Sequence, residues 1–372
     1  MSDRDRVRPR AVAAGEPAPD RLGGAPEQQE QTATDGGTAV AGTDAPVGRR
    51  GREPGDAPRP ADGSPAALTP PAETGASPAG VAAGGEPVAT TETGWRRGLA
   101  ESLAFLRRRM TGEYEVDDFG YDADFTDHVV VPPLKLLYDK WFRIETVGLE
   151  NIPDAGGALL VANHSGTIAV DALMTAVAVR EHHPMHRPLR MLGADLVFQT
   201  PFMGPIARKM GNTLACNPDA ERLLSTGELV AVFPEGFKGV GKPYSQRYRL
   251  QRFGRGGFVT AAMKTGVPII PVSIVGAEEI YPLIGNLKPL ARALGFPYFP
   301  VTPTFPLLGP LGAVPLPSKW IIEFGEPIPT TGFGDNAADD PMVVFNITDR
   351  VRETIQQTLY RLLLRRGHPF LG

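Results

Sequence analysis

From residue 144 onward, short continuous apolar runs alternate with longer segments in which apolar residues recur at helical spacing. Six apolar runs predict strands, at residues 144–148, 157–162, 189–193, 228–233, 268–275 and 320–324. Four segments between them predict helices, at residues 168–180, 201–210, 218–226 and 255–265. Single strands that alternate with helices are typical of an α/β fold. We therefore expect a mixed, largely parallel central sheet flanked by helices.

The last predicted helix has clear start and stop signals. Asp340 suits the N-cap and Pro341 the first turn, and Arg365, Arg366 and Gly367 follow the last apolar residue. Its apolar stripe consists of Val344, Ile347, Val351, Ile355, Leu359 and Leu362. This spacing predicts a long C-terminal helix.

Two helical segments precede the sheet. Residues 134–142 predict a short helix after Pro132 and Pro133, and residues 95–110 carry an apolar stripe with basic ends. The stripe and its flanking cations are Leu99, Leu103, Leu106, Met110, Arg96, Arg97 and Arg107–Arg109. Such a helix suits an anionic membrane surface or a docking position on the domain. We treat residues 95–143 as an N-terminal helical extension and a candidate membrane contact.

The segment before this extension has a different composition. No Phe, Tyr or Trp occurs before Trp95, and residues 1–94 are rich in Ala, Gly, Pro, Glu and Thr. Such a chain buries too little apolar area to offset its conformational entropy. We expect a disordered tail over residues 1–94 and one folded α/β domain over residues 144–372.

Charge and cysteine content narrow the function classes. Residues 1–95 carry a net charge of −5 and the remainder +1, which argues against bulk nucleic-acid binding. One cysteine, Cys216, excludes an intramolecular disulfide and a cysteine-rich zinc site. The charged N-terminus does not resemble a signal peptide, and the sequence has no uninterrupted apolar stretch of about 18 residues. We expect a cytoplasmic protein, peripheral on the inner face of the membrane.

Residues 296–317 are both proline-rich and apolar. Seven prolines exclude a helix or a central strand, and the segment is too apolar for a solvated loop. It suits an irregular strap over the core, or a surface that contacts an acyl chain or a membrane.

A histidine follows one of the predicted strands. His164 ends the apolar run that starts at Leu159, and Asp171 lies seven residues further on. A histidine with a carboxylate in reach can act as a general base near neutral pH. On a continuous helix the two side chains would stand ~10.5 Å apart along the axis. Contact therefore requires Ser165, Gly166 and Thr167 to form a turn over the helix N-terminus, with Thr167 as a candidate N-cap.

Two later motifs lie at or in predicted strands. Phe233-Pro234-Glu235-Gly236 comes after the run at 229–233, where Glu235 is delivered to a strand end and Gly236 allows close backbone approach. Val267-Pro268-Ile269-Ile270-Pro271-Val272 suits a core strand. By contrast, Pro184 breaks the helical spacing that a metal site at His182, His183 and His186 would need. We expect a solvated loop there and no metal site.

Together, these motifs resemble the glycerol-phosphate and lysophospholipid acyltransferase family over roughly residues 130–330. The resemblance implies transfer of a fatty acyl group from acyl-CoA or acyl carrier protein to a hydroxyl of a glycerolipid or related lipid alcohol. His164 would be the base, Asp171 its orienting partner and Glu235 an acceptor contact. No metal or redox cofactor is implied. The implied substrate-binding residues are Asn163, Ser165, Gly166, Phe233, Pro234, Glu235, Gly236, Lys238 and Arg255.

The chain departs from the family pattern at two places. Six residues separate His164 from Asp171, where the family has four, and Ala169 occupies the usual Asp position. In the second family block, Asn217 stands where an arginine would grip the acceptor's phosphate. This favours a neutral acceptor unless other cations compensate, namely Lys238, Lys242, Arg247, Arg249, Arg252 and Arg255.

Two alternatives stay open at this point. One is a hydrolase that uses the same base to activate water on a thioester or ester, although the sequence contains no Gly-x-Ser-x-Gly motif. The other is a non-catalytic lipid-binding protein with the same fold.

Overall fold

The computed structural model describes the backbone of residues 91–334 and 336–370, with side chains described from residue 98. The predicted disordered tail at 1–94 lies almost entirely outside these residues. Within them, none of the helices is long and apolar enough to span a bilayer.

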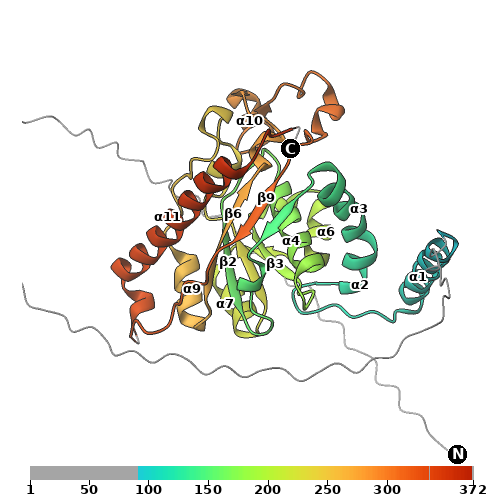
Figure 1. Cartoon of the computed structure of the whole chain (residues 1–372), viewed down its shortest axis with the longest axis horizontal. Coiled ribbons are helices and arrows are strands. Elements are labelled where there is room, and N and C mark those ends of the chain that lie inside the picture. The colour runs from blue at the N-terminus through green and yellow to red at the C-terminus, as the bar shows by residue number, and fades with distance from the viewer. Residues whose placement is uncertain (1–90, 335, 371–372) are drawn as a thin grey trace, which may run out of the picture. The chain divides into compact units, whose positions relative to one another are not determined.

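The core of the fold is a seven-stranded sheet in the order β1-β9-β6-β2-β5-β3-β4 (Figure 1). All neighbours pair in parallel except β6 and β9, which are antiparallel. The strands are β1 (Glu145–Val147), β2 (Ala158–Ala162), β3 (Leu189–Gly193), β4 (Thr213–Leu214), β5 (Leu229–Val232), β6 (Ile269–Val275) and β9 (Ile321–Phe324). The mixed, largely parallel sheet is as predicted, and all six predicted strands are present.

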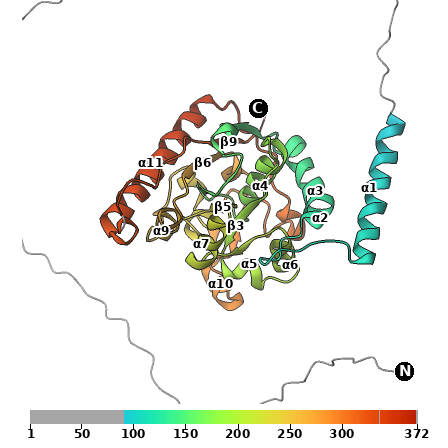
Figure 2. The ribbon, with the colours of Figure 1, turned by 90° about the horizontal axis from the view of Figure 1, so that it is seen from below.

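Helices cover both faces of the sheet, as Figure 2 shows from below. Alternate residues of β2 face opposite ways. Leu160 packs in the apolar cluster with Met174 of α4 (Val170–His182), and Leu159 packs in the cluster with Val259 of α9 (Gly257–Thr265). The sheet is also flanked by α6 (Met203–Lys209), α7 (Asn217–Ser225) and α11 (Pro341–Arg365). Shorter helices are α5 (Asp195–Gln199) and α8 (Phe237–Val240).

The C-terminal helix begins where the sequence predicts. The Asp340 side chain accepts a hydrogen bond from the backbone N–H of Met342 at 2.8 Å. All six residues of the predicted stripe are buried along α11. This helix therefore covers one face of the sheet through a continuous apolar stripe.

The N-terminal extension consists of α1 (Thr91–Thr111) and a helical run from α2 (Ala123–Phe125) through α3 (Val131–Leu136) to Trp141. The helix predicted at 134–142 begins earlier, because Pro132 and Pro133 occupy first-turn positions of α3, where proline is tolerated. Ion pairs of Arg108 with Asp124 and of Arg109 with Asp122 fix the end of α1. The predicted stripe of α1 remains exposed at Leu99, Leu103, Leu106 and Met110.

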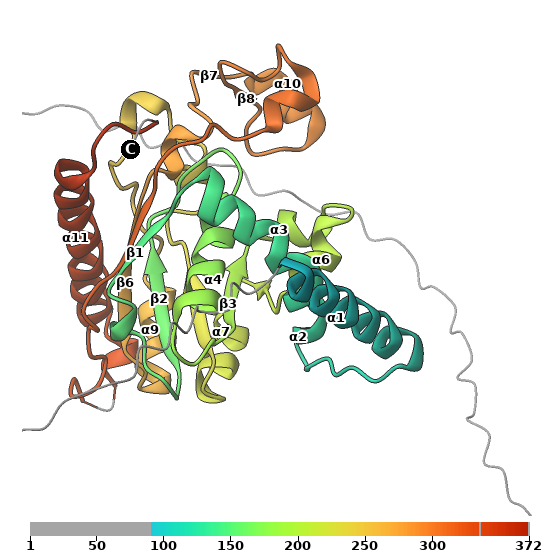
Figure 3. The same ribbon diagram turned by 45° about the vertical axis from the view of Figure 1, so that its right-hand side comes forward.

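A small lobe interrupts the chain between β6 and β9. It contains the antiparallel pair β7 (Gly285–Asn286) and β8 (Pro300–Val301), with α10 (Lys288–Leu294) between them, and a 3₁₀ turn at Gly309–Ala313. Figure 3 shows the lobe projecting at one end of the sheet. The proline-rich segment 296–317 forms its second half, and no α-helix or central strand occurs there, as predicted.

Candidate active site

His164 and Asp171 meet at the carboxyl end of the central strand β2. His164 follows the strand after Asn163, and Asp171 is the second residue of α4. Gly166 turns the chain between them with φ +77°, a conformation that glycine adopts without strain. The His164 Nδ1 lies 2.8 Å from Asp171 Oδ2. The turn predicted from the stretched spacing therefore brings the ring and the carboxylate into contact. Thr167 is not the N-cap, because α4 begins later, at Val170.

The Asp171 carboxylate is fully buried and accepts three hydrogen bonds. Oδ2 accepts from the backbone N–H of Ser165 at 2.8 Å as well as from His164, and Oδ1 accepts from its neighbour Ala172 at 2.9 Å. A carboxylate in this position favours the tautomer in which His164 carries its proton on Nδ1. Nε2 is then the nitrogen that can take a proton, and the ring is 13% exposed.

Two features of the segment after β5 pack against His164. The Phe233 ring packs against His164 with 4.6 Å between ring centroids. A Cβ atom at Gly239 would lie 2.8 Å from the Cβ atoms of both His164 and Glu235, so only glycine fits there. The sequence analysis singled out Gly236, which is exposed with φ +52°, and missed Gly239.

Glu235 supports the backbone of the site. Its Oε1 accepts the backbone N–H of His164 at 2.9 Å, and its Oε2 accepts that of Gln251 at 2.6 Å. The side chain is completely buried. These contacts use both oxygens and tie the turn at His164 to the segment of Gln251, and the acceptor contact of Glu235 stays a prediction. Its cationic neighbour is Lys242 at 3.7 Å, whereas Lys238 is exposed.

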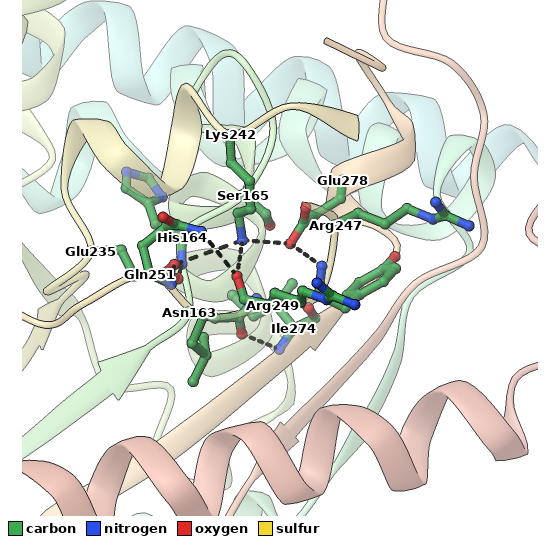
Figure 4. Close-up of polar contacts among 12 residues, drawn as sticks. Asn163, His164, Ser165, Glu235, Lys242, Arg247, Arg249, Gln251, Ile274 and Glu278 are labelled. Carbon is green, nitrogen blue, oxygen red and sulfur yellow. Dashed lines mark hydrogen bonds and ion pairs between the residues drawn. The ribbon is translucent and has the colours of Figure 1, made fainter. Parts of the chain in front are cut away.

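Lys242 links Glu235 to a second buried carboxylate, as Figure 4 shows. Its Nζ donates to Glu278 Oε1 at 2.9 Å and to the carbonyl of Arg249 at 3.3 Å. Because Lys242 is buried in this network, it is not available to a phosphate. The prediction that Lys242 could compensate for the missing arginine is therefore wrong. Burial raises the pKa of Glu278 to about 7, although Lys242 lowers it, and Glu235 adds to the rise.

The pKa of Glu278 predicts a pH-dependent stability. Between about pH 4.5 and 7 the folded chain binds a proton at Glu278 that the unfolded chain has lost, so stability falls as pH rises. At about 1.4 kcal/mol per pKa unit, this interval corresponds to about 3 kcal/mol. Glutamine at position 278 does not titrate. We therefore expect the unfolding free energy of Glu278→Gln minus that of the unchanged protein to increase by about this amount as the pH rises from about 4.5 to 7. Urea denaturation across this pH range measures it.

The matched control is Glu353→Gln, at an exposed position of α11. Its unfolding free energy should run parallel to that of the unchanged protein across the same range. If the unfolding free energy of Glu278→Gln also ran parallel to that of the unchanged protein, Glu278 would not titrate in this pH range, and the prediction would be wrong.

Two other predicted substrate contacts, Asn163 and Ser165, are buried. The Asn163 amide bridges the end of β2 to the backbone of Ile274, at 2.7 and 3.0 Å. Ser165 is fully buried, and its hydroxyl has no hydrogen-bond partner among the described side chains and backbone. His183 is also buried and bonds to the carbonyl of Ile152 at 3.2 Å, so the predicted solvated loop is wrong for this residue.

Two cavities adjoin the site. One, of about 500 Å³, brings the exposed cations Lys238, Arg252 and Arg255 together beside Pro234 and Glu235. The other, of about 250 Å³, is bounded by Thr167 and Ile168 of the turn after His164 and by apolar residues of the lobe. Its lobe residues include Phe296, Tyr298, Phe305 and Ala313.

Tyr298 connects the lobe to the turn that follows His164. Its hydroxyl donates to the carbonyl of Thr167 at 2.5 Å. Burial raises its pKa to about 12, and the nearby Asp171 charge adds to the rise, so the phenol stays protonated as a donor. The sequence analysis singled out the segment that contains Tyr298 and listed Lys242 as a possible phosphate cation, but no sequence pattern predicted the contacts that these two residues make, and none pointed to Glu278.

Comparisons with known proteins agree with one another. A family model described as Acyltransferase matches residues 143–275. An uncharacterized protein of Mycobacterium tuberculosis is 59% identical over 274 residues, which cover 74% of this chain and 76% of that protein. The chloroplastic 1-acyl-sn-glycerol-3-phosphate acyltransferase LPAT1 of Arabidopsis thaliana is 27% identical over 38% of each chain. A "DGAT1/2-independent enzyme synthesizing storage lipids" of Bos taurus is 25% identical, over 45% of this chain and 50% of that protein.

Proposed function

Because the chain belongs to the acyltransferase family, we propose that it transfers a fatty acyl group from an acyl thioester to a hydroxyl of a glycerolipid or related lipid alcohol. The donor would be acyl-CoA or acyl carrier protein. The observation that carries the proposal is the 2.8 Å contact between His164 and Asp171 beside an apolar cavity at the carboxyl end of parallel strands.

His164 would move one proton twice. Its Nε2 takes the proton of the acceptor hydroxyl while the oxygen attacks the thioester carbonyl carbon. The tetrahedral intermediate then collapses, the carbon–sulfur bond breaks, and the imidazolium returns the proton to the leaving sulfur. Asp171 stabilises the imidazolium between these steps and holds the ring orientation. The products are the ester and the free thiol, and the proposed steps involve no metal or redox cofactor.

The apolar cavity would hold the acyl chain of the donor. It begins at Thr167 and Ile168, immediately after the catalytic histidine in the chain, and aromatic residues of the lobe line it. Apolar area removed from water at such a site contributes about 25 cal/mol per Å² to binding. An acyl chain seated there would bring its thioester carbon near His164.

This placement predicts a change in acyl-chain preference. Ala313 lines the cavity, and Ala313→Leu would fill part of it. We expect turnover with a sixteen-carbon donor to fall about tenfold, within the 1–3 kcal/mol range of overpacking, while turnover with an eight-carbon donor changes little. Steady-state rates with donors of both lengths measure the ratio.

The matched control is Ala293→Leu, at an exposed position of α10 that does not line the cavity. It should keep the original chain-length preference. Equal losses for long and short donors in Ala313→Leu would place the acyl chain elsewhere.

The cavity lined by cations suggests that one of the substrates carries a phosphate. Lys238, Arg252 and Arg255 lie together there, whereas Asn217 begins α7 and its amide lies by Gly257. Guanidinium groups suit phosphate oxygens. Lysophosphatidate, monoacylglycerol and diacylglycerol would compete in one assay to identify the preferred acceptor.

Product analysis of the purified chain tests the proposal. Labelled acyl-CoA with an acceptor should give labelled acyl ester and stoichiometric free thiol, including in the presence of EDTA. Free fatty acid formed equally with and without acceptors would assign a hydrolase. Lipid binding without turnover for any donor, acyl carrier protein included, would assign a non-catalytic lipid-binding protein.

A further inference from the structure

The lobe between β6 and β9 has an unusual charge distribution. From Ile284 to Pro317 the only charged residues are Lys288 and Arg292, and both are exposed on α10. No acidic residue occurs in this segment. A soluble surface normally mixes both signs of charge with few apolar side chains. The lobe therefore differs from an ordinary solvated surface.

The apolar side chains of the lobe lie largely in solvent. Leu307 is 84% exposed and Leu311 70% exposed, on the segment before and within the 3₁₀ turn. On α10 the buried residue is Ala291, while the larger Leu290 and Leu294 point outward. The other exposed apolar residues of the lobe are Ile284, Leu287, Phe296, Leu308 and Val314. Clustered exposure of this kind marks a binding surface.

The lobe is also part of the proposed site. It supplies Phe296, Tyr298 and Phe305 to the apolar cavity, and Tyr298 bonds to the catalytic turn at Thr167. A surface that contacts the lobe would thus lie next to the cavity that we assign to the acyl chain.

We propose that this lobe inserts its exposed leucines into the interfacial layer of an anionic lipid bilayer, with Lys288 and Arg292 against the headgroups. The proposal rests on the proposed function only in taking the substrate to be a lipid. The absence of acidic residues and the shared sign of the two cations suit an anionic surface. Insertion would let a lipid reach the cavity without passing through water.

The helix α1 is the competing membrane contact. It also exposes leucines, including Leu103, but its terminal Arg108 and Arg109 pair with Asp124 and Asp122 of the domain. Arg108 and Arg109 are therefore partly neutralised, which leaves Arg107 as the one exposed cation at this end of α1 to which the described contacts give no acidic partner, whereas both Lys288 and Arg292 of the lobe lack one. This difference favours the lobe.

Vesicle co-sedimentation of the full chain tests the proposal. The vesicles would contain phosphatidylcholine alone or with phosphatidylglycerol. We expect the double variant Leu307→Asp/Leu311→Asp to lower the partition coefficient at least about tenfold, since each leucine loses favourable burial. The double variant Lys288→Gln/Arg292→Gln should lose about fivefold per cation on phosphatidylglycerol vesicles only.

The matched control is Leu364→Asp, because Leu364 is 90% exposed on α11, outside the lobe. It should bind vesicles as the unchanged chain does. Unchanged binding of the leucine variant, or loss only in Leu103→Asp, would overturn the proposal. The proposal would also be overturned if the chain formed a dimer that Leu307→Asp/Leu311→Asp dissociates while this variant still binds vesicles. Binding is measured without turnover, so failure of acyl transfer would leave this result unaffected.

Discussion

Alanine in place of His164 is expected to lower kcat/KM for acyl transfer by about 10²–10⁴-fold. The ring contacts Asp171 and packs against Phe233, and the His164 side chain is partly exposed. Alanine removes the proton acceptor and leaves the surrounding backbone contacts in place. Initial rates with a thioester donor and the preferred acceptor measure the loss.

Fold and chemistry need to be separated in this experiment. The backbone N–H of His164 still bonds to Glu235 in the variant, so the melting temperature should change little. The matched control is His128→Ala, where the ring packs against Phe105 in the N-terminal extension. It should retain normal turnover. Full turnover of His164→Ala itself would remove the proposed mechanism.

Much of the sheet was predictable because its central strands are buried on both faces. Ala158–Ala162 and Ile269–Val275 consist almost entirely of apolar residues, and every residue in both is buried. The strand Thr213–Leu214 escaped prediction, since two residues carry no periodicity. The strand order and the antiparallel direction of β9 depend on crossovers, which local patterns do not encode.

The site was predictable only where its residues follow strands or share a turn. His164 and Asp171 are close in sequence, and Glu235 follows β5, which pairs with β2. The hydrogen bonds of Glu235 were not predictable, because its partners His164 and Gln251 come from separate loops. Lys242 and Glu278 form one buried pair across 36 positions of the chain, and neither segment contains a recognisable motif.

The network behind the histidine explains why the catalytic loop can hold its shape. Glu235 binds two backbone N–H groups, and the Lys242 Nζ lies 3.7 Å from Glu235 Oε2 and 2.9 Å from Glu278 Oε1. Removing one partner of a buried ion pair typically costs about 3–5 kcal/mol. The buried charges therefore act on position and stability, while the proton transfer is assigned to His164 alone.

Asparagine in place of Asp171 is expected to reduce kcat/KM by at least about 10²-fold with little change in KM. The amide is nearly the same size as the carboxylate, but it offers one oxygen where the carboxylate offers two. Two backbone N–H groups, from Ser165 and Ala172, compete for that oxygen. The amide NH₂ would then face His164 Nδ1, which favours the tautomer with its proton on Nε2. That tautomer cannot accept the proton of the acceptor hydroxyl.

The pH profile separates this tautomer effect from a loss of fold. If the orienting role is correct, Asp171→Asn should stay folded and keep its vesicle binding while kcat stays low across the neutral range, and its melting temperature should fall only modestly, because one buried backbone N–H loses its acceptor. The matched control is Asp118→Asn, because Asp118 is 77% exposed and pairs with Arg222, not with His164. It should behave as the unchanged chain does. If Asp171→Asn transferred acyl groups at the original rate, the carboxylate would be a helix-capping group, and His164 would need no partner to act as a base.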